Sequence, residues 1–183
     1  VQLSTVRIAD LGDWEPLALG ADLPGLVGFN EEMADSGDLM TVTSRFESQL
    51  DARLQEMFDV KLLSLWPSEL QVLYCRGQGG GVIGVSSFAH ADLLGGLDAV
   101  YVPYDEVLPS LARGAIDCAV GGVLSGNNNR WYEIADVLFL LPMGWDFQAH
   151  VMDLHTWREL GGEHQSILTQ VFQEAEQALW KVA

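Results

Sequence analysis

Residues 113–133 read RGAIDCAVGGVLSGNNNRWYE, and they contain the order of elements that decides the fold. The preceding run DEVLPSLARG has a helical pattern that stops at Gly114, as helices often do at glycine. Residues 115–120 then have the apolar composition of a strand. After Gly121 and Gly122, the polar run SGNNN opens a second helix, because asparagine caps free helix N–H groups well. Helix, strand and helix in succession are typical of an α/β fold.

The rest of the chain shows the same alternation. A helix with regularly spaced apolar residues is expected over 44–58, and the strand-like VKLLSLW follows it and ends before Pro67. Further strands are expected at 70–76, 82–87, 99–104, 137–142 and 148–154, and further helices at 88–94, 155–160 and 166–180. This alternation predicts an α/β architecture for the whole chain.

The composition indicates a folded protein that does not bind polyanions. Hydrophobic residues make up 49% and charged residues 19% of the 183 residues, enough to bury a core in one large domain or two small lobes. The formal charge of −17 repels phosphate backbones and anionic bilayers, so no nucleic-acid partner is expected. No apolar run approaches the roughly 20 residues that cross a bilayer, which predicts no direct membrane insertion.

The sequence lacks the motifs of common catalytic and cofactor sites. The glycine-rich stretch RGQGGG (76–81) has no GK[ST] ending and precedes a strand rather than a helix, which argues against a phosphate loop. The four histidines form no compact ligand set, and no GxSxG elbow occurs. We therefore expect no cofactor, no metal and no catalytic residues, although a triad that forms only in space stays open.

The two cysteines allow two interpretations. Cys75 and Cys118 are too few for a disulfide scaffold, and they have neither CxxC spacing nor a nearby histidine pair for zinc. They form either one disulfide bond or two separately buried thiols.

The stretch VYVPYDEVLPSLARGAIDCAVGGVLSGNNNRWYEIADVLFLLPMGW (100–145) resembles a segment of the extracytoplasmic solute receptors of tripartite ATP-independent periplasmic (TRAP) transporters. That segment has the general form pxxEvyxALxxGxvDg, then a helix bearing k[WF]YEv, then a strand. The resemblance continues through HVMDLHTWREL and EHQSILTQVFQEAEQA. The residues at matching spacing are Glu106, Leu111, Gly114, Asp117, Trp131, Tyr132 and Glu133.

The resemblance implies an α/β, two-lobed periplasmic-binding-protein-like fold with a cleft between the lobes. It places residues 1–67 and 147–183 in the first lobe and residues 68–146 in the second, so that the chain crosses twice between them. Compared with the family, the chain is expected to lack the opening β-α-β-α portion and the closing helices.

The resemblance also implies a function. The protein would capture a small organic solute, an organic acid or a zwitterion, in the periplasm and deliver it to the membrane subunits of a TRAP transporter. Lobe closure would be the binding step, and no bond would be made or broken. Two alternatives stay open: an enzyme that uses the same kind of cleft, and a truncated form that does not bind.

Matching positions in the family suggest three residues of the ligand wall. Tyr104 would line the cleft from the second lobe, with Asp10 from the first lobe and Trp145 near the hinge. Plain packing is the alternative for Tyr104. If Asp10 faces the cleft, its charge would disfavour dianions and favour a zwitterion or a polar neutral solute.

The remaining candidates are Gly84, where a charge is missing, Arg76, which could replace that charge, and Gly121, whose backbone matters. Receptors of this family usually hold a ligand carboxylate with an arginine, where this sequence has Gly84, so that mode of binding is not expected here. Arg76 on the preceding strand is a candidate substitute, with a surface role as its alternative. Gly121 would keep the backbone exposed where a ligand or the other lobe approaches, whereas Trp131 and Tyr132 are expected to pack in the core and hinge.

Overall fold

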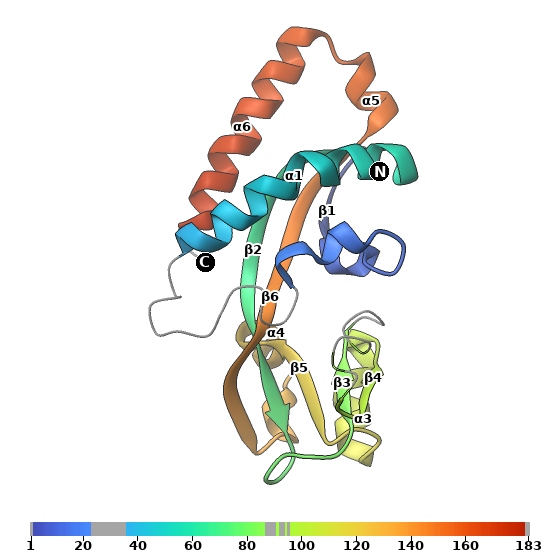
Figure 1. Ribbon diagram of the computed structural model, residues 1–183, viewed down its shortest axis with the longest axis vertical. Coiled ribbons are helices and arrows are strands. Elements are labelled where there is room, and N and C mark those ends of the chain that lie inside the picture. The colour runs from blue at the N-terminus through green and yellow to red at the C-terminus, as the bar shows by residue number, and fades with distance from the viewer. Residues whose placement is uncertain (1, 23–35, 87–90, 92–93, 95, 182–183) are drawn as a thin grey trace.

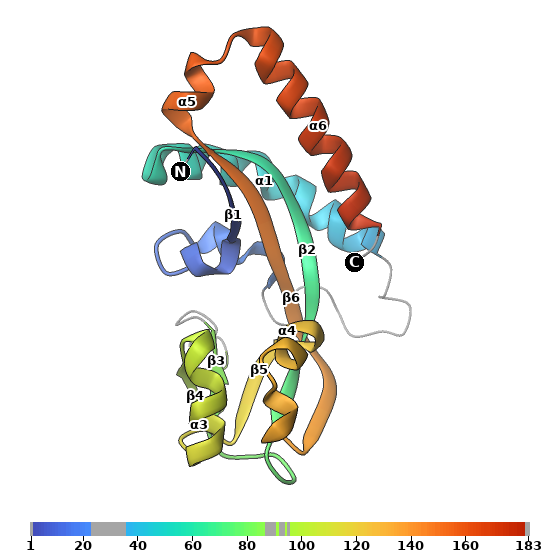
Figure 2. The same cartoon turned by 180° about the vertical axis from the view of Figure 1, so that it is seen from behind.

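Two lobes joined by a pair of long strands make up the protein (Figure 1). The computed structural model describes residues 2–22, 36–86, 91, 94 and 96–181. The helix expected at 88–94 lies almost entirely outside the described residues. Figure 2 shows the same two lobes from behind, with the two long strands again passing from one lobe into the other.

In the described part of the chain, a mixed sheet of six strands runs through both lobes in the order β1-β6-β2-β5-β3-β4. The central pair, β2 and β6, is antiparallel, and β1 and β5 pair antiparallel with its two sides. Beyond β5, the short strands β3 and β4 are parallel. The strands are β1 (Leu3–Arg7), β2 (Val60–Cys75), β3 (Ile83–Val85), β4 (Ala99–Tyr101), β5 (Cys118–Gly122) and β6 (Val137–Asp153).

Helices and short 3-10 turns cover this sheet. The helices predicted near the start and the end of the chain are confirmed, although each begins several residues earlier than its apolar pattern indicated. The helices are α1 (Ser36–Phe58), α3 (Val107–Arg113), α4 (Val123–Asn128), α5 (Leu154–Glu159) and α6 (Gly162–Trp180). The 3-10 segments are η1 (Ile8–Leu11), η2 (Pro16–Asp22), η4 (Tyr104–Glu106) and η5 (Trp131–Glu133).

The two long strands are each longer than expected. The sequence indicated that a strand ends before Pro67 and a new one begins at residue 70, but β2 continues through Pro67. The pairing of β2 with β6 shifts register between Pro67 and Glu69, and a proline is tolerated there because an irregular position needs no N–H donor. The runs 137–142 and 148–154 are likewise parts of one strand, β6. These two continuous strands are the connections between the lobes.

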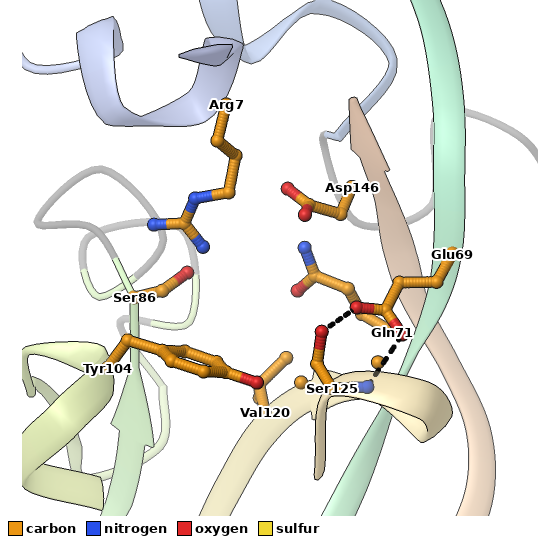
Figure 3. A pocket seen from close by; sticks show the side chains of 10 residues that line it. Arg7, Glu69, Gln71, Ser86, Tyr104, Val120, Ser125 and Asp146 are labelled. Atoms are coloured by element: carbon orange, nitrogen blue, oxygen red, sulfur yellow. Dashed lines mark hydrogen bonds between the residues drawn. The ribbon is translucent and has the colours of Figure 1, made fainter. Parts of the chain in front are cut away.

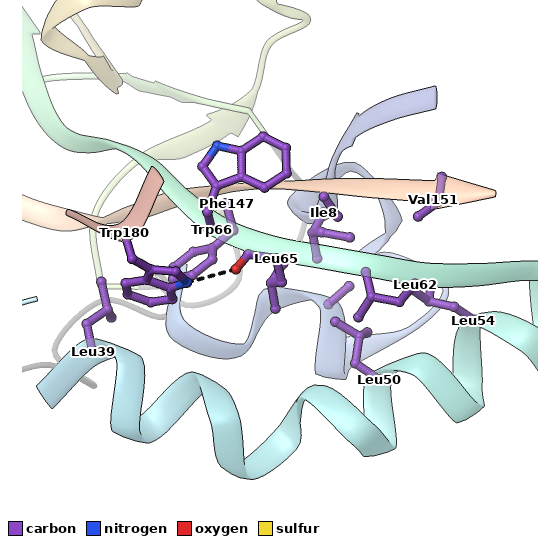
Figure 4. Close-up of a cluster of buried hydrophobic side chains, with 12 residues drawn as sticks. Ile8, Leu39, Leu50, Leu54, Leu62, Leu65, Trp66, Phe147, Val151 and Trp180 are labelled. Carbon is purple, nitrogen blue, oxygen red and sulfur yellow. Dashed lines mark hydrogen bonds between the residues drawn. The ribbon is translucent and has the colours of Figure 1, made fainter. Parts of the chain in front are cut away.

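The first lobe has its own apolar core (Figure 4). Leu50 and Leu54 of α1 are fully buried, and Trp180 at the end of α6 donates a hydrogen bond from Nε1 to the Leu65 carbonyl at 3.0 Å. The core also includes Ile8, Ala18, Leu39, Leu62, Trp66, Phe147, Ala149 and Val151. All of these residues lie before Pro67 or after Asp146 in the sequence.

The second lobe is built around Trp131, whose side chain is 0% exposed. The Tyr74 ring meets the Trp131 ring edge-on with 5.3 Å between the centroids. Cys75 and Cys118, on neighbouring strands, form a disulfide bond, which decides between the two interpretations of the cysteines. Tyr132 is 57% exposed, so the expectation that it packs in the core is wrong.

Residues 113–133 form the predicted succession of helix end, strand and helix, but the second helix is not capped by the predicted residues. Gly114 ends α3 in the left-handed conformation with φ of 71°, as expected of a glycine C-cap. The next helix begins directly after Gly122, which is its N-cap residue. The asparagines at 127–129 therefore lie at the end of α4 and not at its start. The strand β5 thus leads into a helix without an intervening loop.

Candidate functional site

A polar pocket lies where the two lobes face each other (Figure 3). Together with its open mouth it has a volume of about 270 Å³. The strand β1 of the first lobe contributes one lining residue, and the two connecting strands contribute three, one from β6 and two from β2. The lining residues are Arg7, Glu69, Gln71, Ser86, Tyr104, Val120, Gly121, Gly122, Ser125 and Asp146.

Arg7 is the last residue of β1 and brings a positive charge to the pocket. Its guanidinium makes an ion pair with Asp10 of η1, with Nε donating to Oδ1 at 2.9 Å and Nη2 donating to the same oxygen. The Asp10 side chain is largely exposed and does not line the pocket. Asp10 therefore neutralises and orients the pocket arginine from outside.

Asp146 on β6 is a buried acid with an incomplete set of partners. Its side chain is only 8% exposed, and Ser68 donates a long hydrogen bond of 3.4 Å to its Oδ2. Oδ1 has no hydrogen-bond partner among the residues that the structure describes. Burial raises the pKa of the Asp146 carboxyl from 3.8 to about 6, against the lowering effect of Arg7. The pocket thus holds a carboxyl group whose charge is costly when nothing binds to it.

Glu69 on β2 is fixed by the helix that follows β5. The backbone N–H of Ser125 donates to Oε2 at 3.1 Å, and the Ser125 hydroxyl donates to Oε1. A Cβ atom at Gly122 would overlap the Glu69 carboxyl, so only glycine leaves room for this arrangement. Gln71, two residues along β2 and also lining the pocket, is buried. The strand β2 therefore presents two polar side chains in a row to the pocket.

Tyr104, the candidate that the family resemblance suggested, is one of the residues that line the pocket from the second lobe. Its ring packs on Trp131 with 5.3 Å between the centroids, and its hydroxyl accepts a hydrogen bond from Nδ2 of Asn129 at 3.3 Å. Burial raises the pKa of the Tyr104 hydroxyl, which therefore keeps its proton and remains a donor. Gly121 also lines the pocket, and a Cβ there would lie 2.5 Å from the Trp131 ring.

The remaining candidates from the sequence lie elsewhere. Gly84 is inside the second lobe, where a Cβ would lie 2.7 Å from Ile116. Arg76, directly after β2, donates from Nη1 to the Leu111 carbonyl at 2.7 Å and ties the end of the strand to α3. Trp145 packs against the core of the first lobe. These three residues, like Asp10, are outside the lining of the pocket described here.

The charged residues of the pocket were not found from the sequence. Arg7, Glu69 and Asp146 are far apart in the chain, and only the fold brings them together. One signal did exist, because Glu69 and Asp146 are acidic residues in the interior of strands that are mostly apolar. A charged residue in the middle of such a run needs a partner or a solvent-filled space, and here the pocket supplies that space.

Within the part of the chain that the structure describes, no group of three or more His, Cys, Asp or Glu side chains is arranged to hold a metal ion. In the same part of the chain, every helix is too short or too polar to cross a membrane.

Two α/β lobes connected by two strands, with a polar pocket between them, define the architecture of a two-lobed, periplasmic-binding-protein-like fold. The family model of the bacterial extracellular solute-binding proteins, family 7 (DctP), matches residues 91–183, which is half of the chain. The chain belongs to this family. Membership confirms the resemblance to the TRAP solute receptors and the two-lobed α/β fold that it implied.

Solved structures of such receptors share the fold. A Bordetella pertussis extracytoplasmic solute receptor binding pyroglutamic acid matches with a TM-score of 0.84 and 18% identity, over 100% of this chain and 62% of that chain. A Desulfovibrio salexigens TRAP periplasmic solute-binding protein with bound orotic acid matches with a TM-score of 0.83 and 16% identity, over 98% of this chain and 59% of that one.

A third receptor, from a Sulfitobacter species and with bound β-D-galacturonate, matches with a TM-score of 0.81 and 16% identity, over 100% of this chain and 62% of that one. This chain therefore spans about 60% of the length of these structures. Among curated protein sequences there is no significant match.

Proposed function

We propose that the protein is an extracytoplasmic solute receptor that binds a small organic solute in the pocket between its lobes. The proposal rests on one observation, which is that the residues lining the pocket come from both lobes. Arg7 comes from the first lobe, Asp146 from β6, which crosses between the lobes, and Tyr104 and Ser125 from the second lobe. A solute that contacts Arg7 on one side and Tyr104 or Ser125 on the other would stabilise the closed arrangement over an open one.

We also propose the lobe boundaries at residues 67–68 and 146–147. The core of the first lobe is formed by residues up to Trp66 and from Phe147 onward, and the cores of the second lobe by residues between Val72 and Trp131. Among the described residues, β2 and β6 are the elements that run through both regions, so these strands are the expected hinge. The register shift after Pro67 lies at this crossing, where irregular pairing allows a strand to bend.

The solute class follows from the polarity of the pocket. Arg7 supplies a cation for an acidic group, and the hydroxyls of Tyr104 and Ser86 supply further hydrogen bonds. The solved relatives with bound pyroglutamate, orotate and galacturonate are receptors of small organic acids. We therefore propose an organic acid or a zwitterion.

The cellular setting is part of the same proposal. A receptor of this family would act in the periplasm and deliver its solute to the membrane subunits of a TRAP transporter. The disulfide between Cys75 and Cys118 supports an oxidising compartment, because disulfides persist there and are rare in the cytosol.

A solute screen tests the proposal and separates it from an enzyme. Small organic acids and amino acids are added to the protein in a thermal-shift assay, and each hit is measured by calorimetry. A solute at 100 times its Kd should stabilise the fold by about 2.7 kcal/mol. Mass spectrometry of the recovered solute should show that it is unchanged. Formation of a product would favour an enzyme, and the absence of binding by every solute would contradict a receptor.

A further inference from the structure

We propose that the solute carries a cationic nitrogen that donates hydrogen bonds, an ammonium or amidinium group, and that Asp146 binds this group with Glu69 beside it. The inference rests on the proposed function, because it names the chemistry of the solute that the same pocket takes. Four observations carry it: an unsatisfied buried oxygen, the arrangement of the two walls, the balance of charge and the titration of the acid.

The first observation is the missing partner of Asp146. Its carboxyl is 8% exposed and lines the pocket, yet Oδ1 accepts no hydrogen bond from the described residues. Oδ2 has one long bond to the Ser68 hydroxyl at 3.4 Å. Buried polar atoms are almost always hydrogen-bonded, because an unsatisfied one costs about 1–3 kcal/mol and more when it is charged. A donor group of a solute in the pocket would complete this site.

The second observation is the separation of charge across the pocket. Figure 3 shows Asp146, Gln71 and Glu69 along one wall, with Arg7 and Ser86 along the other. A solute with a carboxylate at one end and a cationic nitrogen at the other would match both walls at once. A solute with carboxylates at both ends would place one of them against the acidic wall.

The third observation is the balance of charge around the pocket. When ionised, Glu69, Asp146 and the neighbouring Asp10 are three carboxylates, whereas the described lining of the pocket includes one guanidinium, that of Arg7. Arg7 is already in an ion pair with Asp10. A cationic group on the solute would offset the remaining negative charge, whereas a second anionic group would add to it.

The fourth observation is the titration of Asp146. Burial is the main cause that raises its pKa to about 6, the charges of Glu69 and Asp10 raise it further, and Arg7 and the Ser68 hydroxyl lower it. A cation needs the ionised carboxylate, so binding must release the proton when the pH is below about 6. Affinity for a cationic solute should therefore fall on acidification, by up to about tenfold per pH unit below the pKa.

A matched series of ring carboxylates tests the proposal. L-Proline has a ring ammonium, L-pyroglutamate has a neutral ring N–H, and cyclopentanecarboxylate has no nitrogen. The linear pair 4-aminobutyrate and butyrate extends the comparison. We expect calorimetry with the unmodified chain at pH 7.5 to show binding for at least one of the two sets. Within that set, the ammonium-bearing solute should bind at least about tenfold more tightly than the others. At pH 5 this advantage should shrink.

The substitution Asp146→Asn identifies the residue. It should remove the advantage of the ammonium-bearing solute and its pH dependence, while binding of the nitrogen-free acid stays equal or becomes tighter. The exposed Asp13→Asn, which removes the same charge outside the pocket, is the control. If Asp146→Asn does not fold, the solute preference and the pH dependence of the unmodified chain still decide the question.

The outcomes separate this inference from the proposed function. If a nitrogen-free acid or pyroglutamate binds as tightly as its ammonium-bearing counterpart, the inference is wrong and the receptor function stands. The inference is also wrong, and the receptor function stands, if Asp146→Asn still binds the ammonium-bearing solute more tightly than its counterparts. In that case water would be the partner of Oδ1. If no solute binds in the series or in the wider screen, the proposed function fails, and this inference fails with it.

Discussion

Cys75 and Cys118 lie directly opposite each other on β2 and β5 and are joined by a disulfide bond. The bond closes a loop with a sequence separation of 43, which contains β3, β4 and α3. It therefore ties the outer part of the second lobe to the long strand that comes from the first lobe. In the unfolded chain, the same bond restricts the conformations that this segment can adopt.

We expect that replacing both cysteines by serine lowers the free energy of unfolding by about 2–4 kcal/mol. Urea denaturation of the two proteins measures the difference. A reducing agent should shift the midpoint of the unmodified chain in the same direction and should not change that of the double variant. Equal midpoints for the oxidised and reduced chain would show that the bond does not stabilise the lobe.

Gly121 is expected to tolerate no side chain. A Cβ atom there would lie 2.5 Å from the ring of Trp131, which is fully buried and cannot move away. Gly121→Ala should therefore cost about 1–3 kcal/mol of unfolding free energy, the usual range for overpacking a core. Gly162→Ala, at the first residue of α6, is the matched control, because nothing lies within 4 Å of its Cβ position. A variant at 121 that is as stable as the control would contradict the packing described here.

The stability of the first lobe should depend on pH through Glu176 on α6. Burial, and after it the charge of Glu47, raises the pKa of Glu176 from 4.5 to about 7. The folded state thus holds this proton more tightly than the unfolded chain does. This group therefore destabilises the fold progressively as the pH rises from about 4.5 through about 7.

Glu176→Gln removes that charge and can still accept the hydrogen bond from the Leu65 N–H. We expect it to be more stable than the unmodified chain at pH 8 and equal to it below pH 4.5, as measured by denaturation over this range. Glu174→Gln, at an exposed position of the same helix, corrects for the general effect of removing one charge from a protein of net charge −17. An equal gain for both variants would contradict a special role of Glu176.

The sequence predicted the order of the elements well because that order depends on local signals. Gly114 stops α3, and apolar runs mark the interior of β5 and of the long strands. The sequence-based prediction of a strand end at Pro67 was wrong. A proline normally ends a strand, but the register shift that accommodates Pro67 depends on pairing with β6.

The pocket could be predicted only in part, because its residues are also brought together by pairing between distant strands. Tyr104 and Gly121 follow from the family resemblance, whereas Arg7, Glu69 and Asp146 meet only through the sheet.

Asp10 should influence the charge that the pocket accepts, although it lies outside the lining. It neutralises Arg7 through their ion pair. Asp10→Asn should therefore raise the affinity for a dianionic solute relative to a monoanionic one, by a modest factor of about two to five, because the pair is partly exposed and screened. Competition binding with the best acid from the screen and a dicarboxylate measures this ratio. A ratio that does not differ from that of Asp13→Asn would exclude such an effect.

The central claim is that one solute touches both lobes, and calorimetry on two single variants tests it most directly. Arg7→Gln changes the first lobe and Tyr104→Ala changes the second, while Arg158→Gln on α5 removes a positive charge at an exposed position far from the pocket lining. With the best solute of the screen, each pocket variant should bind at least about tenfold more weakly than the control. Unchanged affinity in both Arg7→Gln and Tyr104→Ala would contradict binding in this pocket.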